Sequence, residues 1–198
     1  LKGPAVMKHG FRHPFVGEIL DQGVDVNART NVGWTPLMLA ATRSSIPQLV
    51  ALLIEKGAAV NAKNADSKTP LKLASEFSLT PEIVALLIEN GAEIEARDHN
   101  GSPPLMAATK NFKNPEIVTL LLEKGAEIEA RNIDHMTPLM RATCSFSSTP
   151  EIVKLLLDKG ANPLAKNKAG KKAIDYAKEN EKLKGTSAYW KLHDKSFE

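Results

Sequence analysis

The sequence repeats itself with a period of 34 residues. Four short strings mark one series, each 34 residues after the one before it: Thr35-Pro36-Leu37, Thr69-Pro70-Leu71, Pro103-Pro104-Leu105 and Thr137-Pro138-Leu139. A series of glycines keeps the same spacing and lengthens by one residue at its last step: Gly23, Gly57, Gly91, Gly125 and Gly160. A fixed period of a few tens of residues indicates stacked units of supersecondary structure rather than one closed core.

Each unit contains the signals for two helices. Threonine can cap free amides and proline fits the first helical position, so Thr69-Pro70 predicts a helix start. A second start follows at Thr80, Asn114 and Thr149, because each is followed by proline and then by an acid, which favours the positive end of a helix. The second helix carries a run of Ile, Val and Leu, and we expect the periodic glycine to end it in a left-handed conformation.

The segment between the glycine and the next unit predicts a hairpin-like loop. Residues 93–96 alternate polar and apolar side chains, which indicates a short extended arm, and residues 98–101 are rich in turn formers. The sequence therefore predicts an all-α solenoid whose helix-turn-helix units are joined by β-hairpin-like loops.

This order of elements resembles the ankyrin repeat, with the likeness running from Pro14 to about Ala177. On this resemblance residues 1–198 form a single ankyrin repeat domain. Its parts are an N-terminal partial repeat (1–32), four full repeats (33–66, 67–100, 101–134 and 135–169) and a C-terminal capping repeat with a helix (170–198). We expect Phe15, Val16, Ile19 and Leu20 to point inward in the first part, and Tyr189, Trp190 and Leu192 to pack the cap onto the fourth repeat.

Two departures from the family pattern carry predictions. The usual histidine after Thr-Pro-Leu is replaced by Met38, Lys72, Met106 and Met140, so we expect the buried polar link between neighbouring repeats to be missing. Ser67 and His135 stand where two of the loop tips normally carry glycine, which leaves the backbone conformation there open.

Charge and apolar runs argue against two classes of partner. The net charge is +3, but the nine lysines from Lys166 onward concentrate the excess at the C-terminus. Nucleic-acid binding normally needs a basic stripe over the contact face, so we expect no nucleic-acid partner. The longest apolar runs fall far short of the roughly 20 residues that a spanning helix needs, so we expect no membrane span. The sequence does not fix the cellular compartment. The cytoplasm is slightly favoured, and the protein would be exported if a signal segment preceded Leu1.

A search for catalytic patterns finds little. The chain has no glycine-rich phosphate loop, nucleophile elbow or Cys-x-x-Cys motif. His9 and His13 have helical metal-ligand spacing, but they lack a third ligand nearby. Cys144, the single cysteine, excludes an intramolecular disulfide and is expected to be a packing residue despite nearby Arg141. We therefore predict no enzyme activity, no metal and no cofactor.

Repeating glutamates are expected to serve the repeat itself. Glu93, Glu95, Glu127 and Glu129 recur at the same places in two units, which favours a solvated face or ion pairs with Arg97 and Arg131 over paired-carboxylate catalysis.

Surface positions that differ between units are the candidates for recognition. The resemblance implies that these lie at the loop tips and on the first helix, facing a concave groove. In this sequence the positions are Asn31, Val32, Trp34, Thr42, Arg43, Ala65, Lys68, Glu76, Phe77, His99, Asn100, Ser102, Lys110, Asn111, Ile133, Asp134, Met136, Arg141 and Ser145. Trp34 and Phe77 have the character of binding hot spots. The alternatives are that Trp34 folds back on its own hairpin and that Phe77 fills the connection between two helices.

The sequence thus predicts a monomeric, non-catalytic module that binds another protein through its concave groove and loop tips. The alternative is a regulatory or targeting fragment of a larger exported or host-directed bacterial effector. Residues before Leu1 would distinguish the two.

Overall fold

The computed structural model describes residues 23–43, 46–78, 80–111, 114–144 and 149–196. The described residues form ten helices and no strands: α2 (Pro36–Arg43), α3 (Pro47–Glu55), α4 (Pro70–Phe77), α5 (Pro81–Glu89), α6 (Pro104–Ala108), α7 (Glu116–Glu123), α8 (Pro138–Cys144), α9 (Pro150–Asp158), α10 (Ala173–Ala177) and α11 (Ser187–Lys195). The predictions for His9, His13, Phe15, Val16, Ile19 and Leu20 lie outside these residues.

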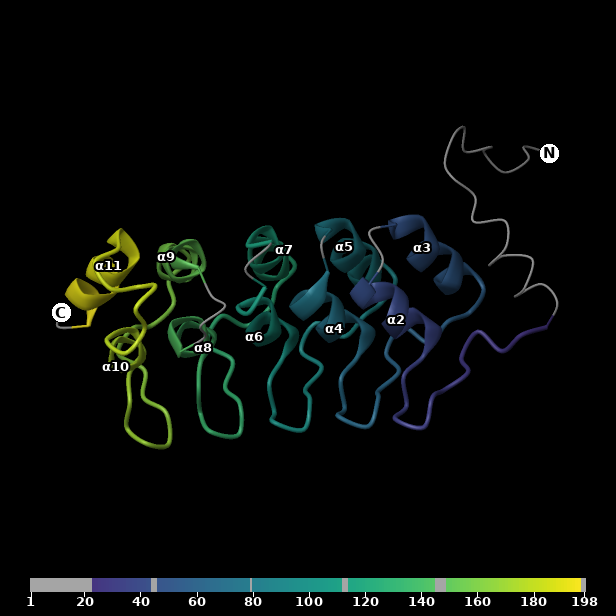
Figure 1. Cartoon of the computed structure of the whole chain (residues 1–198), viewed down its shortest axis with the longest axis horizontal. Helices are drawn as coiled ribbons and strands as arrows, with labels where there is room; N and C mark the ends of the chain where they lie inside the picture. Colours follow the sequence, from purple (N-terminus) through teal and green to yellow (C-terminus); the bar gives the residue numbers. More distant parts are fainter. Residues whose placement is uncertain (1–22, 44–45, 79, 112–113, 145–148, 197–198) are drawn as a thin grey trace.

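The helices form two rows that run along the long axis of the molecule (Figure 1). We call α2, α4, α6, α8 and α10 the inner helices, because they lie next to the loops, and α3, α5, α7, α9 and α11 the outer helices. The loops project side by side from the inner row. This arrangement confirms the predicted all-α solenoid. No helix in the described part of the chain is long and apolar enough to cross a membrane.

The inner helices begin where the sequence predicts. The hydroxyl of Thr69 accepts the backbone N–H of Lys72 at 3.3 Å, and Thr35 and Thr137 make the same bond three residues ahead. Proline occupies the first helical position, where no amide donor is needed. The Thr-Pro pair therefore caps and starts these helices as expected.

The prediction that Thr80 and Thr149 cap the outer helices is wrong. Their hydroxyl groups are buried without a hydrogen-bond partner among the described residues. The N–H groups of Ile83 and Ile152 donate instead to the backbone carbonyls of Thr80 and Thr149, at 3.3 and 3.1 Å. The N–H group that would otherwise donate to the threonine hydroxyl is thus used in a tight first turn of the helix.

The loops keep the predicted glycine caps but not the extended arms. Gly57 has a φ of 88°, as the left-handed end of a helix requires, and the later periodic glycines are similar. At residues 93–96, the N–H of Ala96 donates to the carbonyl of Glu93, which makes a turn instead of an arm. Ser67 and His135 both have a φ of 58°, so these tips keep the left-handed conformation without glycine.

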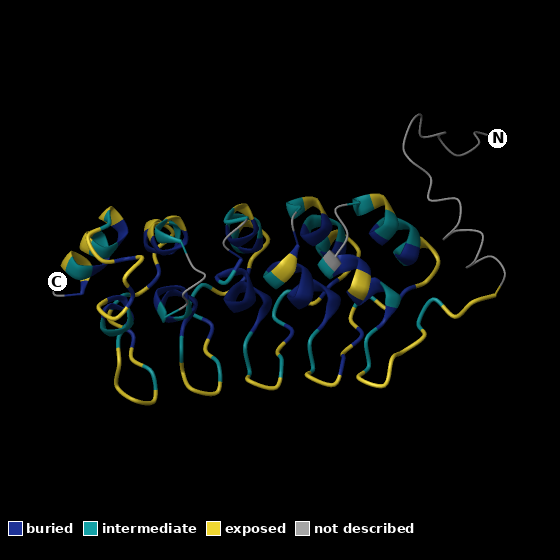
Figure 2. Cartoon of the chain, viewed as in Figure 1, coloured by how far each residue is buried: buried dark blue, intermediate teal, exposed yellow. Residues whose placement is uncertain are grey.

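The core lies between the two rows of helices and runs from one unit into the next (Figure 2). Leu71 on α4 is fully buried, and so are Val84 and Leu87 on α5. Leu105 and Leu139 occupy the place of Leu71 in the next two units and are equally enclosed. Burial of a side chain of this size stabilises a fold by about 1.5–3 kcal/mol, so repetition of the same contacts supplies most of the driving force.

Hydrogen bonds from side chains also join neighbouring units in series. The side-chain oxygen of Asn61 accepts the N–H of Glu93 at 2.8 Å, and Glu95 accepts the N–H of Glu127 at 2.9 Å. Asn27 and Glu129 take the corresponding places in the first and last links. Glu95 and Glu129 thus serve the repeat, but each does so by accepting an N–H of the next unit's backbone and not through the predicted solvated face or ion pairs.

The arginines use a different acceptor from the one predicted. Arg97 donates to the carbonyl of Arg131 at 2.6 Å, and Arg131 donates to the carbonyl of Lys166 at 3.0 Å. Neither arginine forms an ion pair with a glutamate within the described ranges. They also join each unit to the next.

The expectation that no buried polar link joins the repeats is wrong at one junction. The Nζ of Lys72 is 3.1 Å from Oδ2 of Asp98 in the loop that leads to the next unit, and the two side chains are 3% and 9% exposed. The same ammonium donates to the carbonyls of Ser102 and Pro103. Lysine therefore provides the link that histidine gives in the family pattern.

The protonation of this pair follows from burial and from its partners. Burial lowers the pKa of Lys72, although the charge of Asp98 opposes this. Burial alone would raise the pKa of Asp98. The hydrogen bond from the backbone of Ser102 and the charge of Lys72 outweigh burial, so the pKa of Asp98 is lowered. The carboxylate also accepts the N–H of Asn100 at 2.9 Å. Asp98 is therefore ionised at neutral pH.

At the other junctions, a neutral pair of residues takes the place of Lys72 and Asp98. Where Lys72 faces Asp98, the corresponding pairs of residues are Met38 with Asn64, Met106 with Asn132, and Met140 with Asn167. These asparagines accept the same loop amides as Asp98 does, as Asn64 shows by accepting from Asp66 and Lys68. Lysine in place of methionine at position 72 is thus matched by aspartate in place of asparagine at position 98.

At the C-terminus, α11 closes the array. Leu192 is fully buried and Tyr189 packs partly against the core, as predicted. Trp190 is 54% exposed and lies outside that packing, so the prediction for this residue is wrong.

The Lys72–Asp98 pair gives a first testable prediction. Asp98→Asn leaves a buried ammonium without its counter-charge, so we expect a loss of about 3 kcal/mol in the free energy of unfolding. The double variant Lys72→Met/Asp98→Asn recreates the pair found at the other junctions, and we expect it to lie within about 1 kcal/mol of the unsubstituted protein. Urea denaturation measures both. Equal losses in the single and double variants would contradict the assignment.

Candidate functional site

The predicted recognition residues lie mainly on one side of the molecule. We call this side the inner face: the surface of α2, α4, α6 and α8 together with the loops that project beside them (Figure 1). Exposed residues occur at the loop tips, on α2 and α4, and along the outer helices (Figure 2). The shared residues are inside the stack, and exposed positions of the inner face differ from one unit to the next.

Two apolar side chains on adjacent inner helices face solvent. Phe77 at the end of α4 is 49% exposed, and Leu39 on α2 is 40% exposed. The alternative for Phe77, burial in the connection between helices, is therefore wrong. Leu39 was missed by sequence reasoning, because Leu73 holds the same position one unit later and is 1% exposed. No local signal distinguishes these two leucines.

Trp34 is partly buried, and it explains why Leu73 is covered. The indole packs against Met38, Ala62 and Leu73 in a small apolar cluster separate from the main core. Its backbone is paired with Thr30 on the other side of the loop. Trp34 thus lies against the next unit, and only part of the ring remains on the inner face.

The position of Phe77 has a structural use in other units. Asn111 takes that place one unit later, is 4% exposed, and donates its amide to the carbonyls of Ser78 at 2.9 Å and Ser75 at 3.4 Å. Asn180 in the cap similarly donates to the carbonyl of Thr143 at 2.9 Å. Asn111 is therefore a link between units and does not belong to the exposed surface, contrary to its placement among the partner-binding residues. Phe77 lacks this bond and leaves a phenyl ring in water.

Three charged groups of the inner face form a network. Glu76 accepts from Lys110 of the next unit at 3.0 Å, and Lys68 of its own loop is 3.6 Å away. One carboxylate thus serves two ammonium groups, and both lysines stay about one-third exposed or slightly less. The network keeps an excess positive charge next to Phe77.

Arg141 on α8 replaces the apolar residues of the other units. Its Nη1 is 3.5 Å from the Sγ of Cys144, and the side chain is half-buried. No carboxylate lies within ion-pair distance of Arg141 in the described part of the chain. On α2, the hydroxyl of Thr42 donates to the carbonyls of Met38 and Leu39, so it is engaged with its own helix.

The loop tips form a connected row. The N–H of Ala65 donates to the carbonyl of Val32 at 3.0 Å, and that of Ile133 donates to the carbonyl of Asn100 at 3.0 Å. Val32 and Ile133 expose more than half of their surface. The remaining tip residues of the predicted set are exposed or half-buried: Asn31, His99, Ser102, Asp134 and Met136. Ser145 and the side chain of Arg43 lie outside what the structure describes.

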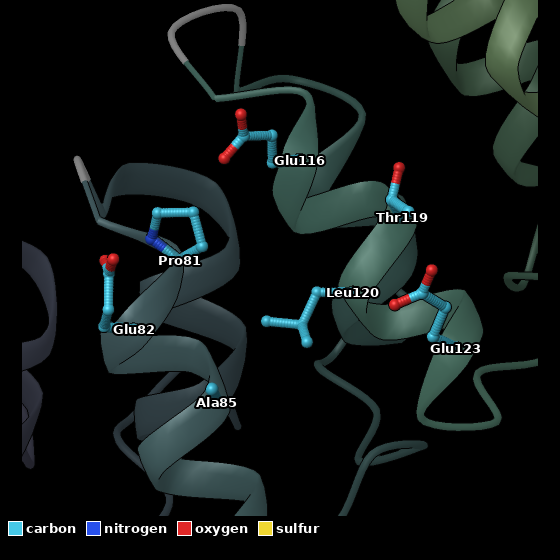
Figure 3. Close-up of a pocket in the computed structure, with 7 residues that line it drawn as sticks. All are labelled: Pro81, Glu82, Ala85, Glu116, Thr119, Leu120 and Glu123. Carbon is cyan, nitrogen blue, oxygen red and sulfur yellow. The ribbon is translucent and has the colours of Figure 1, made fainter.

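The outer helices form a different surface. An open groove runs between α5 and α7, lined by acidic, apolar and small side chains (Figure 3): Pro81, Glu82, Ala85, Glu116, Thr119, Leu120 and Glu123. The glutamates here have no basic partner within ion-pair distance among the described residues. The described residues also contain no group of three or more His, Cys, Asp or Glu side chains that could hold a metal ion.

The comparisons with known proteins agree with this architecture. A family model of ankyrin repeats, which spans three copies, matches residues 5–98, 78–167 and 105–185. No curated protein matches the chain.

The burial of Trp34 and the exposure of Phe77 predict different costs of truncation. We expect Trp34→Ala to lower the free energy of unfolding by about 2 kcal/mol, because it uncovers Met38 and Leu73. Phe77→Ala removes a ring that is half in water, so we expect a loss below about 1 kcal/mol. Chemical denaturation followed by circular dichroism measures both. A larger loss for Phe77→Ala than for Trp34→Ala would contradict the geometry described above.

Proposed function

Because the chain belongs to the ankyrin repeat family, a non-catalytic fold whose members are generally protein–protein interaction modules, we propose that it binds another protein through its inner face and does no chemistry. Phe77 carries the proposal. In a stacked array the residues that all units share hold the stack together, whereas exposed differences are free to serve recognition. At this position Asn111 and Asn180 bury an amide that joins two units, whereas Phe77 exposes a phenyl ring.

The surroundings of Phe77 have the features of a binding hot spot. Aromatic and arginine side chains dominate the energetics of most protein interfaces, and they work best when a partner excludes water from them. Leu39 widens the apolar area, and Trp34 supplies a partly exposed edge that its packing holds in place. Lys68, Lys110 and Arg141 provide polar groups around this area that can fix the orientation of a partner.

The proposed mechanism is recognition by a preformed surface. The tips are hydrogen-bonded to one another, and the inner helices are packed side by side, so little conformational entropy is lost when a partner binds. We propose that the protein acts as a monomer, since α11 packs against α9 and its Leu192 is fully buried.

An affinity pull-down from a lysate of the source organism tests the proposal. The bait is the unsubstituted protein, compared with Phe77→Asn, and captured proteins are quantified by mass spectrometry. Ala41 corresponds to Ser75 one unit earlier, so we expect the new amide to donate to its carbonyl as Asn111 donates to that of Ser75, and stability to be preserved. We expect at least a tenfold loss of one or more captured proteins, because losing a hot-spot ring costs about 2 kcal/mol or more.

A matched control uses the outer groove. Glu116→Gln/Glu123→Gln changes two side chains on the opposite surface and should capture the same proteins as the unsubstituted bait. If Phe77→Asn is folded and retains every captured protein, or if the outer-groove variant is the one that loses them, binding through the inner face is refuted.

A further inference from the structure

From α2 to α9, the distribution of charge differs sharply between the inner and the outer helices. The outer helices α3, α5, α7 and α9 contain seven acidic residues and one lysine. The inner helices α2, α4, α6 and α8 contain three basic residues and one acidic residue. An acidic partner would therefore be attracted to the inner row and repelled by the outer row.

The positive charge of the inner face is only partly neutralised. The charge of Lys72 is cancelled by buried Asp98 and offers nothing to a partner. Glu76 is shared between Lys68 and Lys110, which leaves one cationic charge in excess. Arg141 has no carboxylate within ion-pair distance in the described residues. Two cationic positions thus remain, one after α6 in the third full repeat and one on α8 in the fourth.

Lys110 and Arg141 lie at increasing distance from Phe77 along the row of inner helices. Phe77 ends α4, Lys110 follows α6, and Arg141 lies on α8, so each belongs to the next inner helix in the row. Neighbouring packed helices are about 8–10 Å apart. An extended chain advances about 3.3 Å per residue, so it crosses one helix spacing in about three residues. Lys110 is therefore about three residues, and Arg141 about six, from an anchor at Phe77.

We propose that the inner face binds an acidic peptide segment of its partner, in which an apolar side chain covers Phe77 and Leu39 and carboxylates about three and six residues away pair with Lys110 and Arg141. This inference rests on the proposed function and specifies the chemistry of the partner. The apolar anchor supplies the burial. The carboxylates set the direction and register of the segment, because the cations lie on one side of the anchor.

Selection from a random library of 12-residue peptides tests the chemistry without knowledge of the natural partner. Peptides are displayed and selected on the unsubstituted protein, and the enriched peptides are afterwards tested for binding to Phe77→Asn. We expect the enriched peptides to carry an aromatic or aliphatic residue with acidic residues about three and six positions from it. Synthetic versions are then measured by fluorescence anisotropy at low and high salt, and higher salt should weaken their binding.

Charge reversal provides the sharper measurement. We expect Lys110→Glu and Arg141→Glu each to lower the affinity for an acidic peptide at least tenfold. When the acid that faces position 110 is changed to lysine in the peptide, we expect Lys110→Glu to bind that peptide more tightly than the unsubstituted protein does. Glu116→Lys/Glu123→Lys on the outer groove serves as the control and should leave the affinity unchanged. Circular dichroism and urea denaturation check that every variant is folded.

The outcomes separate this inference from the proposed function. Enriched peptides that are neutral or basic, yet lose binding to Phe77→Asn, would overturn the acidic-peptide inference and leave inner-face binding intact. Enriched acidic peptides that bind Phe77→Asn, Lys110→Glu and Arg141→Glu as well as the unsubstituted protein would overturn both. Repeated selections that enrich no peptide would overturn the inference of a short acidic segment, while the pull-down still decides the proposed function.

Discussion

A pair of short helices cannot enclose its own apolar face, and this constraint governs the whole molecule. Leu71 and Val84 are fully buried because the units on either side cover them. The backbone links made by Asn61 and Glu95 connect the same neighbours. Each unit therefore depends on the next for both apolar burial and hydrogen bonding. The positions that meet these needs repeat along the chain, and the others can vary.

Variation within the stack and variation on its surface have different physical consequences. The exchange of methionine for Lys72 places an ammonium in the interior, and it is matched by Asp98 across the junction, where the other units have asparagine. Phe77 stands where Asn111 and Asn180 use a buried amide to join two units. It lacks that link and exposes an apolar ring. Contact of an apolar ring with water is unfavourable, so a binding partner that covers the ring is the simplest explanation for its exposure.

The sequence was sufficient to predict the features that depend on local chemistry and on the period. Helix starts at Thr69, the glycine caps and the two rows of helices follow from residues a few positions apart. The features that were missed depend on contacts between units. Leu39 and Leu73 differ in exposure because Trp34 covers only the second, and the burial of Asn111 depends on carbonyls more than 30 residues earlier. Within one sequence, such contacts leave no local signal.

Hydrogen–deuterium exchange of the protein, alone and saturated with the tightest acidic peptide from the selection, tests most directly whether the exposed differences between units form the binding surface. Local protection from exchange reports which backbone amides a ligand stabilises. Binding at the inner face predicts slower exchange in α2, α4, α6 and α8 and in the adjoining loops, with α3, α5 and α7 changed little. Protection confined to the outer helices, or to α11 and the C-terminal cap, would contradict it.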